Sequence, residues 1–81
     1  MKLPRDVGGD ELVRRLTLVG YERVHQTGSH VRIRAIIDGK PHTITIPLND
    51  PLRVRTLHHI LKDVAAHLHI PQTRLIEELF P

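Results

Sequence analysis

The stretch "HVRIRAIIDGKPHTITI", residues 30–46, decides the fold of this 81-residue chain. Apolar side chains occupy every second position in its first half, which is the period of a β-strand with one buried face. The Asp38-Gly39 pair that follows is a strong signal for a tight turn. The alternation resumes in residues 42–46, so the stretch predicts two antiparallel strands that bury one face and expose the other.

The N-terminal part of the chain predicts one helix and one more strand. Residues 10–19 have apolar side chains at helical spacing, with Asp10 as the expected N-cap and Gly20 as the expected left-handed end. Residues 21–26 are expected to form the first strand of the sheet. Residues 1–9 contain a proline and a glycine pair, which predict an irregular lead-in.

The C-terminal part predicts two more helices. Thr56 is the expected cap of the first, whose apolar residues form one continuous stripe. Residues 70–80 predict a short closing helix opened by Pro71. The order α-β-β-β-α-α therefore predicts a single α+β domain, residues 1–81, in which helices pack on one face of a three-stranded antiparallel sheet.

Charge and composition favour RNA as a partner and argue against several other classes of protein. The net charge is +3 and the pI is about 10.0, and most of the cations are arginine, whose planar fork suits phosphate. Tyr21 and Phe80 are the sole aromatic residues, which argues against stacking of single-stranded bases. The sequence has no cysteine, no signal peptide pattern and no apolar run of the roughly 20 residues that a membrane helix needs. We therefore expect a cytoplasmic protein without a membrane segment.

The exposed face of the second predicted strand holds the main candidates for chemistry. Strand parity places His30, Arg32 and Arg34 away from the helices, beside the threonines of the next strand. Histidine exchanges protons near neutral pH, and arginine stabilises negative charge on phosphate oxygens. The set therefore suits cleavage of RNA through its own 2′-hydroxyl. The alternative is a solvated histidine beside arginines that keep an open sheet face soluble.

Metal binding is a weaker alternative for the histidines. His25 and His42 could lie near His30 on neighbouring strands, but no acidic residue is clearly placed to complete such a ligand set. No two histidines have the i, i+4 spacing of a helical zinc site. We therefore expect no metal and no cofactor, and we expect Asp63 to form a surface ion pair with His59 one helical turn away.

Two further features bear on phosphate binding. Arg53 and Arg55 precede the second helix, whose free amide groups and positive dipole end attract anions. They form either a phosphate dock or a solvated loop. Gly28 can adopt the positive φ that re-aims the chain at the start of the second strand.

The motifs together resemble those of the HicA (YcfA-like) toxins of bacterial toxin–antitoxin systems. That family combines a Gly-aromatic pair, a Gly-Ser-His element, a hairpin, a strand that ends in proline, and a Thr-Leu pair at the second helix. The resemblance covers about residues 10–80. Here it is carried by Gly20-Tyr21, Gly28-Ser29-His30, Asp38-Gly39, Ile46-Pro47 and Thr56-Leu57.

The resemblance implies a fold like that of a double-stranded RNA-binding domain and the activity of a ribonuclease that cleaves mRNA. It implies that His30 is catalytic and that a HicB antitoxin neutralises the protein. Ser29 is then expected to orient the imidazole or to hydrogen-bond the phosphate. A non-catalytic RNA-binding or protein-binding module on the same fold is the alternative, and homodimerisation stays open. The residues expected to position the RNA are Gly28, Arg32, Arg34, Arg53 and Arg55.

The chain departs from the family pattern at two places. Val31 follows the histidine, where the family often has an aromatic residue or a second histidine. Asn49-Asp50 and Arg55 stand in the loop where the family often has a histidine and a glycine. This loop is therefore expected to contact RNA or the antitoxin differently.

Overall fold

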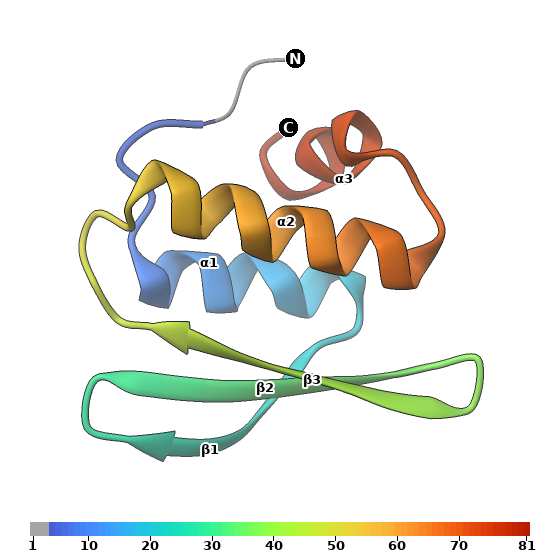
Figure 1. Ribbon diagram of the computed structural model, residues 1–81, viewed down its shortest axis with the longest axis horizontal. Helices are drawn as coiled ribbons and strands as arrows, with labels where there is room; N and C mark the ends of the chain where they lie inside the picture. The colour runs from blue at the N-terminus through green and yellow to red at the C-terminus, as the bar shows by residue number, and fades with distance from the viewer. Residues whose placement is uncertain (1–3) are drawn as a thin grey trace.

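A three-stranded antiparallel sheet and three α-helices form the part of the chain described by a computed structural model, residues 4–81 (Figure 1). The expected order α-β-β-β-α-α is confirmed, and residues 1–3 of the expected lead-in lie outside the described residues. None of the helices within residues 4–81 is long and apolar enough to cross a membrane. The elements are α1 (Gly9–Leu16), the 3₁₀ turn η1 (Thr17–Val19), β1 (Glu22–Thr27), β2 (His30–Ile37), β3 (Lys40–Pro47), α2 (Val54–Leu68) and α3 (Gln72–Leu79).

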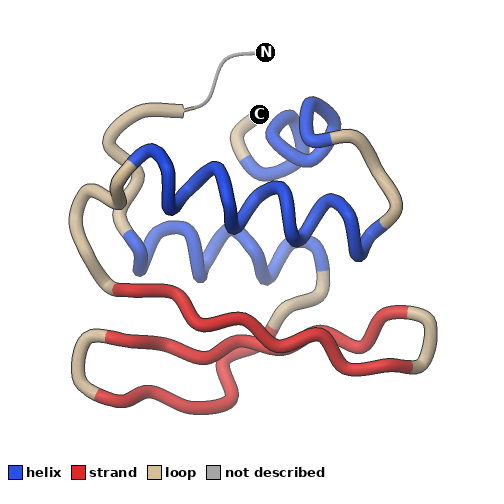
Figure 2. Tube along the Cα trace, viewed as in Figure 1, coloured by secondary structure: helices blue, strands red, loops and turns tan. Residues whose placement is uncertain are grey.

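The central strand, β2, fixes the two faces of the sheet. The strand order is β1-β2-β3, and Val31 and Ile33 pair with Ile46 and Ile44 across the hairpin. The first three of these residues are buried and Ile44 is half-buried, whereas the residues between them on β2 are exposed. Both α1 and α2 lie on this apolar side of the sheet (Figures 1 and 2). The predicted packing of helices on one face is therefore confirmed.

The core lies between the sheet and the helices, and its buried members are all apolar. The closing helix α3 packs against α2 on the side away from the sheet (Figure 2). Arg15 ties it to α1, because its Nη1 donates to the Leu79 carbonyl at 2.7 Å and its guanidinium lies 4.6 Å from the centre of the Phe80 ring. Burial of each large aliphatic side chain contributes about 1.5–3 kcal/mol. The fully buried members include Leu12, Leu16, Tyr21, Val31, Ile33, Ile46, Leu61, Val64, Leu75 and Leu79.

Both α1 and α2 begin without the side-chain caps that the sequence suggests. The N-cap of α1 is Gly8, and Asp10 lies inside the first turn. There its carboxylate accepts hydrogen bonds from two arginines, one of them Arg23 of β1 at 2.6 Å. The N-cap of α2 is Arg53, and Thr56 already lies within the helix. The predicted caps at Asp10 and Thr56 are therefore wrong, although the negative charge of Asp10 still suits a helix N-terminus.

The first helical segment ends at Gly20, the glycine that the sequence predicts for this position. Regular helix stops at Leu16, and η1 continues the chain to Gly20, whose φ of 102° is the left-handed conformation that glycine adopts readily. The backbone N–H of Tyr21 still donates to the Leu16 carbonyl at 3.2 Å. For that reason β1 begins at Glu22, one residue later than expected.

The start of α1 lies so close to the end of β3 that residue 9 has no room for a side chain. The N–H of Gly9 donates to the Asn49 carbonyl at 2.8 Å, and the N–H of Leu52 donates to the Val7 carbonyl at 2.7 Å. A Cβ at position 9 would lie 2.0 Å from the Pro47 carbonyl oxygen. The end of the expected irregular lead-in is therefore held against the loop that leads into α2.

Gly9→Ala is expected to lower the free energy of unfolding by more than about 2 kcal/mol, because the new methyl group would collide with backbone atoms that cannot move independently. In an open helix the same change would instead stabilise by about 1 kcal/mol. Gly8→Ala is the matched control, since its Cβ would meet only the side chain of Asp50, at 3.0 Å. Urea denaturation measures both variants, and a Gly9→Ala protein as stable as Gly8→Ala would contradict the close approach.

Candidate functional site

The outward face of the sheet carries the polar side chains of β2. His30, Arg32 and Arg34 alternate with the buried residues of that strand and are all exposed. Thr43 and Thr45 of β3 pair with Arg34 and Arg32, so they share this face. The face that strand parity predicts for these residues is therefore confirmed.

Five side chains from all three strands line a hollow of about 260 Å³ on this face. His30 lies opposite Thr27 of β1. Arg32 lies between its two partners, His25 of β1 and Thr45 of β3. Two imidazoles, one guanidinium and two hydroxyls therefore meet around one space. The lining residues are His25, Thr27, His30, Arg32 and Thr45.

A β-bulge at Val24 brings His25 to this face. Arg23 pairs with Ile33 and His25 pairs with Arg32, so two steps along β1 match one step along β2. In a regular strand His25 would share the face of Arg23, which is the side covered by the helices. The extra residue turns it outward, as bulges beside functional sites often do. The ring is held there by a 2.8 Å hydrogen bond between its Nε2 and the Thr27 hydroxyl.

The Gly-Ser-His turn borders the hollow. Gly28 has a φ of 52°, which confirms the predicted positive φ. The hydroxyl of Ser29 lies 3.4 Å from Nδ1 of His30, so the two groups are at the outer limit of a hydrogen bond. The Ser29 carbonyl accepts a 2.7 Å hydrogen bond from the N–H of Leu48, which fixes the turn to the end of β3.

The remaining predicted arginines lie outside the hollow. Arg34 is opposite Glu22 of β1 and lines a separate recess with that residue. Arg53 and Arg55 are exposed at the N-terminus of α2, and Arg55 lies within its first turn. That end of α2 lies at the same end of the molecule as the β1–β2 turn (Figure 1). The structure thus brings His30 and Arg32 together and leaves the other three arginines apart.

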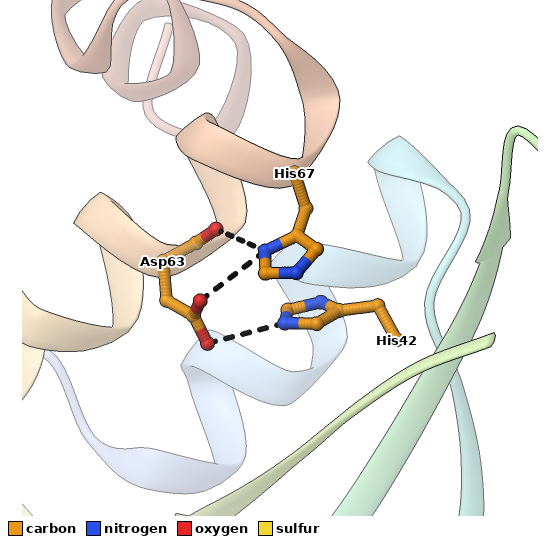
Figure 3. A group of neighbouring side chains, drawn as sticks. All are labelled: His42, Asp63 and His67. Carbon is orange, nitrogen blue, oxygen red and sulfur yellow. Dashed lines mark hydrogen bonds and ion pairs between the residues drawn. The ribbon is translucent and has the colours of Figure 1, made fainter. Parts of the chain in front are cut away.

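The predicted neighbourhood of His42 is wrong. His42 shares the parity of Ile44 and Ile46, so it lies on the helix side of the sheet, away from His25 and His30. There it meets two residues of α2, and the His42, Asp63 and His67 side chains form one cluster (Figure 3). A metal set made of His25, His30 and His42 is therefore excluded by the parity of β3.

Asp63 joins the two histidines of this cluster. Its Oδ2 lies 3.1 Å from Nε2 of His42, and its Oδ1 lies 3.2 Å from Nδ1 of His67 (Figure 3). The pairing predicted between His59 and Asp63 is therefore wrong. Asp63 and His67 also have the i, i+4 spacing, so the sequence indicates the pair that forms as well as it indicates the pair with His59.

Tyr21 extends the cluster into the core. Its hydroxyl lies 2.6 Å from Nδ1 of His42. Because a carboxylate only accepts hydrogen bonds, Nε2 of His42 donates to Asp63, and in the neutral imidazole Nδ1 accepts from the phenol. Burial, and then the negative charge of Asp63, raise the pKa of Tyr21 to about 12. The phenol of Tyr21 therefore stays protonated at neutral pH and keeps its hydrogen bond with Nδ1 of His42.

Tyr21→Phe is expected to remove a loss of stability at high pH. The unfolded tyrosine ionises near pH 10, whereas the folded one has a pKa of about 12. The stabilisation is fully present below about pH 10 and is lost as the pH rises toward 12, by on the order of 2 kcal/mol. Urea titrations between about pH 9 and pH 11 should show this decline in the wild type beyond any decline in the Phe variant. Parallel declines in the two proteins would contradict the raised pKa.

Comparison with known proteins adds one match. A family model described as HicA toxin of bacterial toxin–antitoxin matches residues 9–65, which include every strand and the larger part of α2. No curated protein matches the chain. No solved structure matches it either.

Proposed function

The chain belongs to the HicA toxin family of bacterial toxin–antitoxin systems, and on that basis we propose that it is a ribonuclease whose catalytic centre is the hollow around His30. One observation carries the proposal. Two imidazoles, His25 and His30, line the same hollow as the guanidinium of Arg32. Cleavage of RNA by its own 2′-hydroxyl needs two proton transfers and stabilisation of a negatively charged phosphorus centre.

The proposed reaction uses these three groups in turn. One imidazole takes the proton of the 2′-hydroxyl, whose oxygen then attacks the phosphorus atom. The bond from phosphorus to the 5′ oxygen breaks, and the second imidazole, in its protonated form, gives that oxygen a proton. Arg32 stabilises the negative charge that builds on the non-bridging oxygens. The products are a 2′,3′-cyclic phosphate and a 5′-hydroxyl end.

The surrounding side chains support this assignment of roles. The hydrogen bond between the Thr27 hydroxyl and Nε2 of His25 holds that ring in the hollow. The Ser29 hydroxyl lies 3.4 Å from Nδ1 of His30 and would hydrogen-bond either this imidazole or the phosphate. Arg34, Arg53 and Arg55 are exposed beyond the hollow and would contact the phosphates of a longer RNA.

Family membership implies an antitoxin partner, and we propose that this partner is of the HicB type. The hollow is open on the outward face of the sheet, which the helices leave uncovered. An antitoxin that covers this face would exclude RNA from His25, His30 and Arg32 together. Neutralisation then requires no change in the fold of the toxin.

His30→Ala and His25→Ala are each expected to lower the rate of cleavage of a defined RNA by roughly 10²–10⁴-fold, the usual contribution of a positioned acid or base. The wild type should show a bell-shaped pH–rate profile, and each variant should lose one limb of it. His59→Gln, a change at an exposed histidine of α2, is the control and should cleave at the wild-type rate. Equal cleavage by the wild type and by His30→Ala would show that His30 is not catalytic, whereas no cleavage above background by the wild type would favour a non-catalytic binding module.

Arg32 is expected to bind RNA phosphate more strongly than Arg34, although both are exposed on the same strand. Arg34 faces Glu22, whose carboxylate competes with phosphate for the guanidinium. In a His30→Ala background, Arg32→Gln should flatten the dependence of log affinity on log salt by about 0.7, the value for one contact to single-stranded RNA. Arg34→Gln should change it less. An unchanged slope for Arg32→Gln would show that the RNA lies on another surface. Equal flattening by the two variants would show that Glu22 does not compete for Arg34.

A further inference from the structure

The second group of polar side chains lies between β3 and α2, on the helix side of the sheet. We propose that His42, Asp63 and His67 form a binding site for a divalent transition metal, with zinc as the best fit (Figure 3). Each residue offers one ligand atom, and these atoms all lie within 4.8 Å of one another. Two imidazole nitrogens and one carboxylate oxygen are a set of ligands that zinc commonly takes in proteins, with a fourth position left for water.

The spacing of the ligand atoms is near to that of a metal site. Ligands 2.0–2.1 Å from a tetrahedral zinc are separated from each other by about 3.3 Å. Nε2 of His42 is 3.1 Å from Oδ2 of Asp63, and Nδ1 of His67 is 3.2 Å from Oδ1. A cation can therefore take the place of the proton between His42 and Asp63 with little movement of those two side chains. Nδ1 of His67 also lies 3.0 Å from the Asp63 carbonyl oxygen, and that ring must turn before it can bind the ion.

His42 is already oriented as a metal-binding histidine. A ligating imidazole usually has its other nitrogen held by a hydrogen bond, which fixes the ring and its tautomer. Here Nδ1 of His42 lies 2.6 Å from the hydroxyl of Tyr21, a fully buried residue. Only 11% of the His42 side chain is exposed, so the ring has little freedom to turn. When a metal occupies Nε2, Nδ1 carries the ring proton and donates a hydrogen bond to the phenol oxygen.

His67 supplies the movable ligand. Its ring stacks on that of His42, with centroids 3.5 Å apart and planes 20° apart. Two stacked rings cannot both aim an in-plane lone pair at one ion, so His67 has to rotate on binding. Its side chain is 48% exposed, and the cluster borders a hollow of about 510 Å³ that His42 and His67 line. There is therefore room for the His67 ring to rotate and for a water molecule to act as the fourth ligand.

A metal at this cluster would join β3 to α2 and act on stability rather than on cleavage. His42 pairs with Ala35 of β2, five residues from His30, a separation of about 17 Å along the strand. The cluster also lies on the opposite face of the sheet from the hollow around His30. The site therefore does not depend on the proposed ribonuclease activity, and either proposal can fail alone.

Zinc chloride titrated into the metal-free full chain, without an affinity tag, tests the site. Isothermal calorimetry near pH 7.5 should give one saturable site per chain, and cobalt should give the visible absorption of a tetrahedral complex. Free zinc at roughly 100 times the Kd should raise the Tm by about 15 °C. A chelator should reverse that rise and leave the rate of RNA cleavage unchanged.

Substitutions at the cluster identify where the ion binds. Asp63→Asn and His67→Gln should each weaken zinc binding by at least about 10-fold, and both positions are exposed enough for the fold to survive. His59→Gln removes a neighbouring histidine of α2 and should bind zinc as the wild type does. No saturable heat at millimolar zinc would overturn the proposal. Equal affinity in the wild type and in His67→Gln would also overturn it, because the zinc would then be bound elsewhere.

Discussion

The burial of one face of β2 is the constraint on which the rest of the structure depends. Val31, Ile33 and Ala35 lie against the helices, and their burial is worth several kcal/mol in total. A slip of one residue in register would expose all three and push Arg32 into an apolar core, which would cost more than the burial gains. Burial of the inner face of β2 is therefore enough to place His30 and Arg32 on the outward face, and contacts made by these two side chains are not needed for it.

The same constraint places two groups of polar side chains on opposite faces of the sheet. The outward face holds two histidines and an arginine around an open hollow. The helix side holds a different pair of histidines, joined through Asp63 and backed by a buried tyrosine. Because side chains alternate along β3, His42 cannot serve both groups. Substitutions in one group can therefore leave the other group unchanged.

The sequence predicts the sheet and its two faces well because both follow from the alternation of apolar and polar side chains along a strand. It predicts His30 and Arg32 on the outward face for the same reason. It also suggests that His25 could lie near His30, which the shared hollow confirms. It does not indicate the bulge at Val24 that turns His25 outward, since that bulge arises from pairing between strands and leaves no mark in the alternation of β1. Asp10 fails as a cap because the contact of Gly9 with the Asn49 carbonyl starts the helix one residue earlier, so that Asp10 lies inside the first turn and pairs with Arg23. The wrong grouping of His42 is a different case, because the parity of its own strand already contradicted it.

We propose that RNA binds and reacts on the outward face of the sheet. The most direct measurement is the ¹H–¹⁵N spectrum of the wild type titrated with a 2′-O-methyl RNA, which binds but lacks the attacking hydroxyl. We expect little change along α3 and clear shifts at the residues that line the hollow, which are His25, Thr27, His30, Arg32 and Thr45. Shifts confined to the helices, with these five residues unmoved, would contradict it.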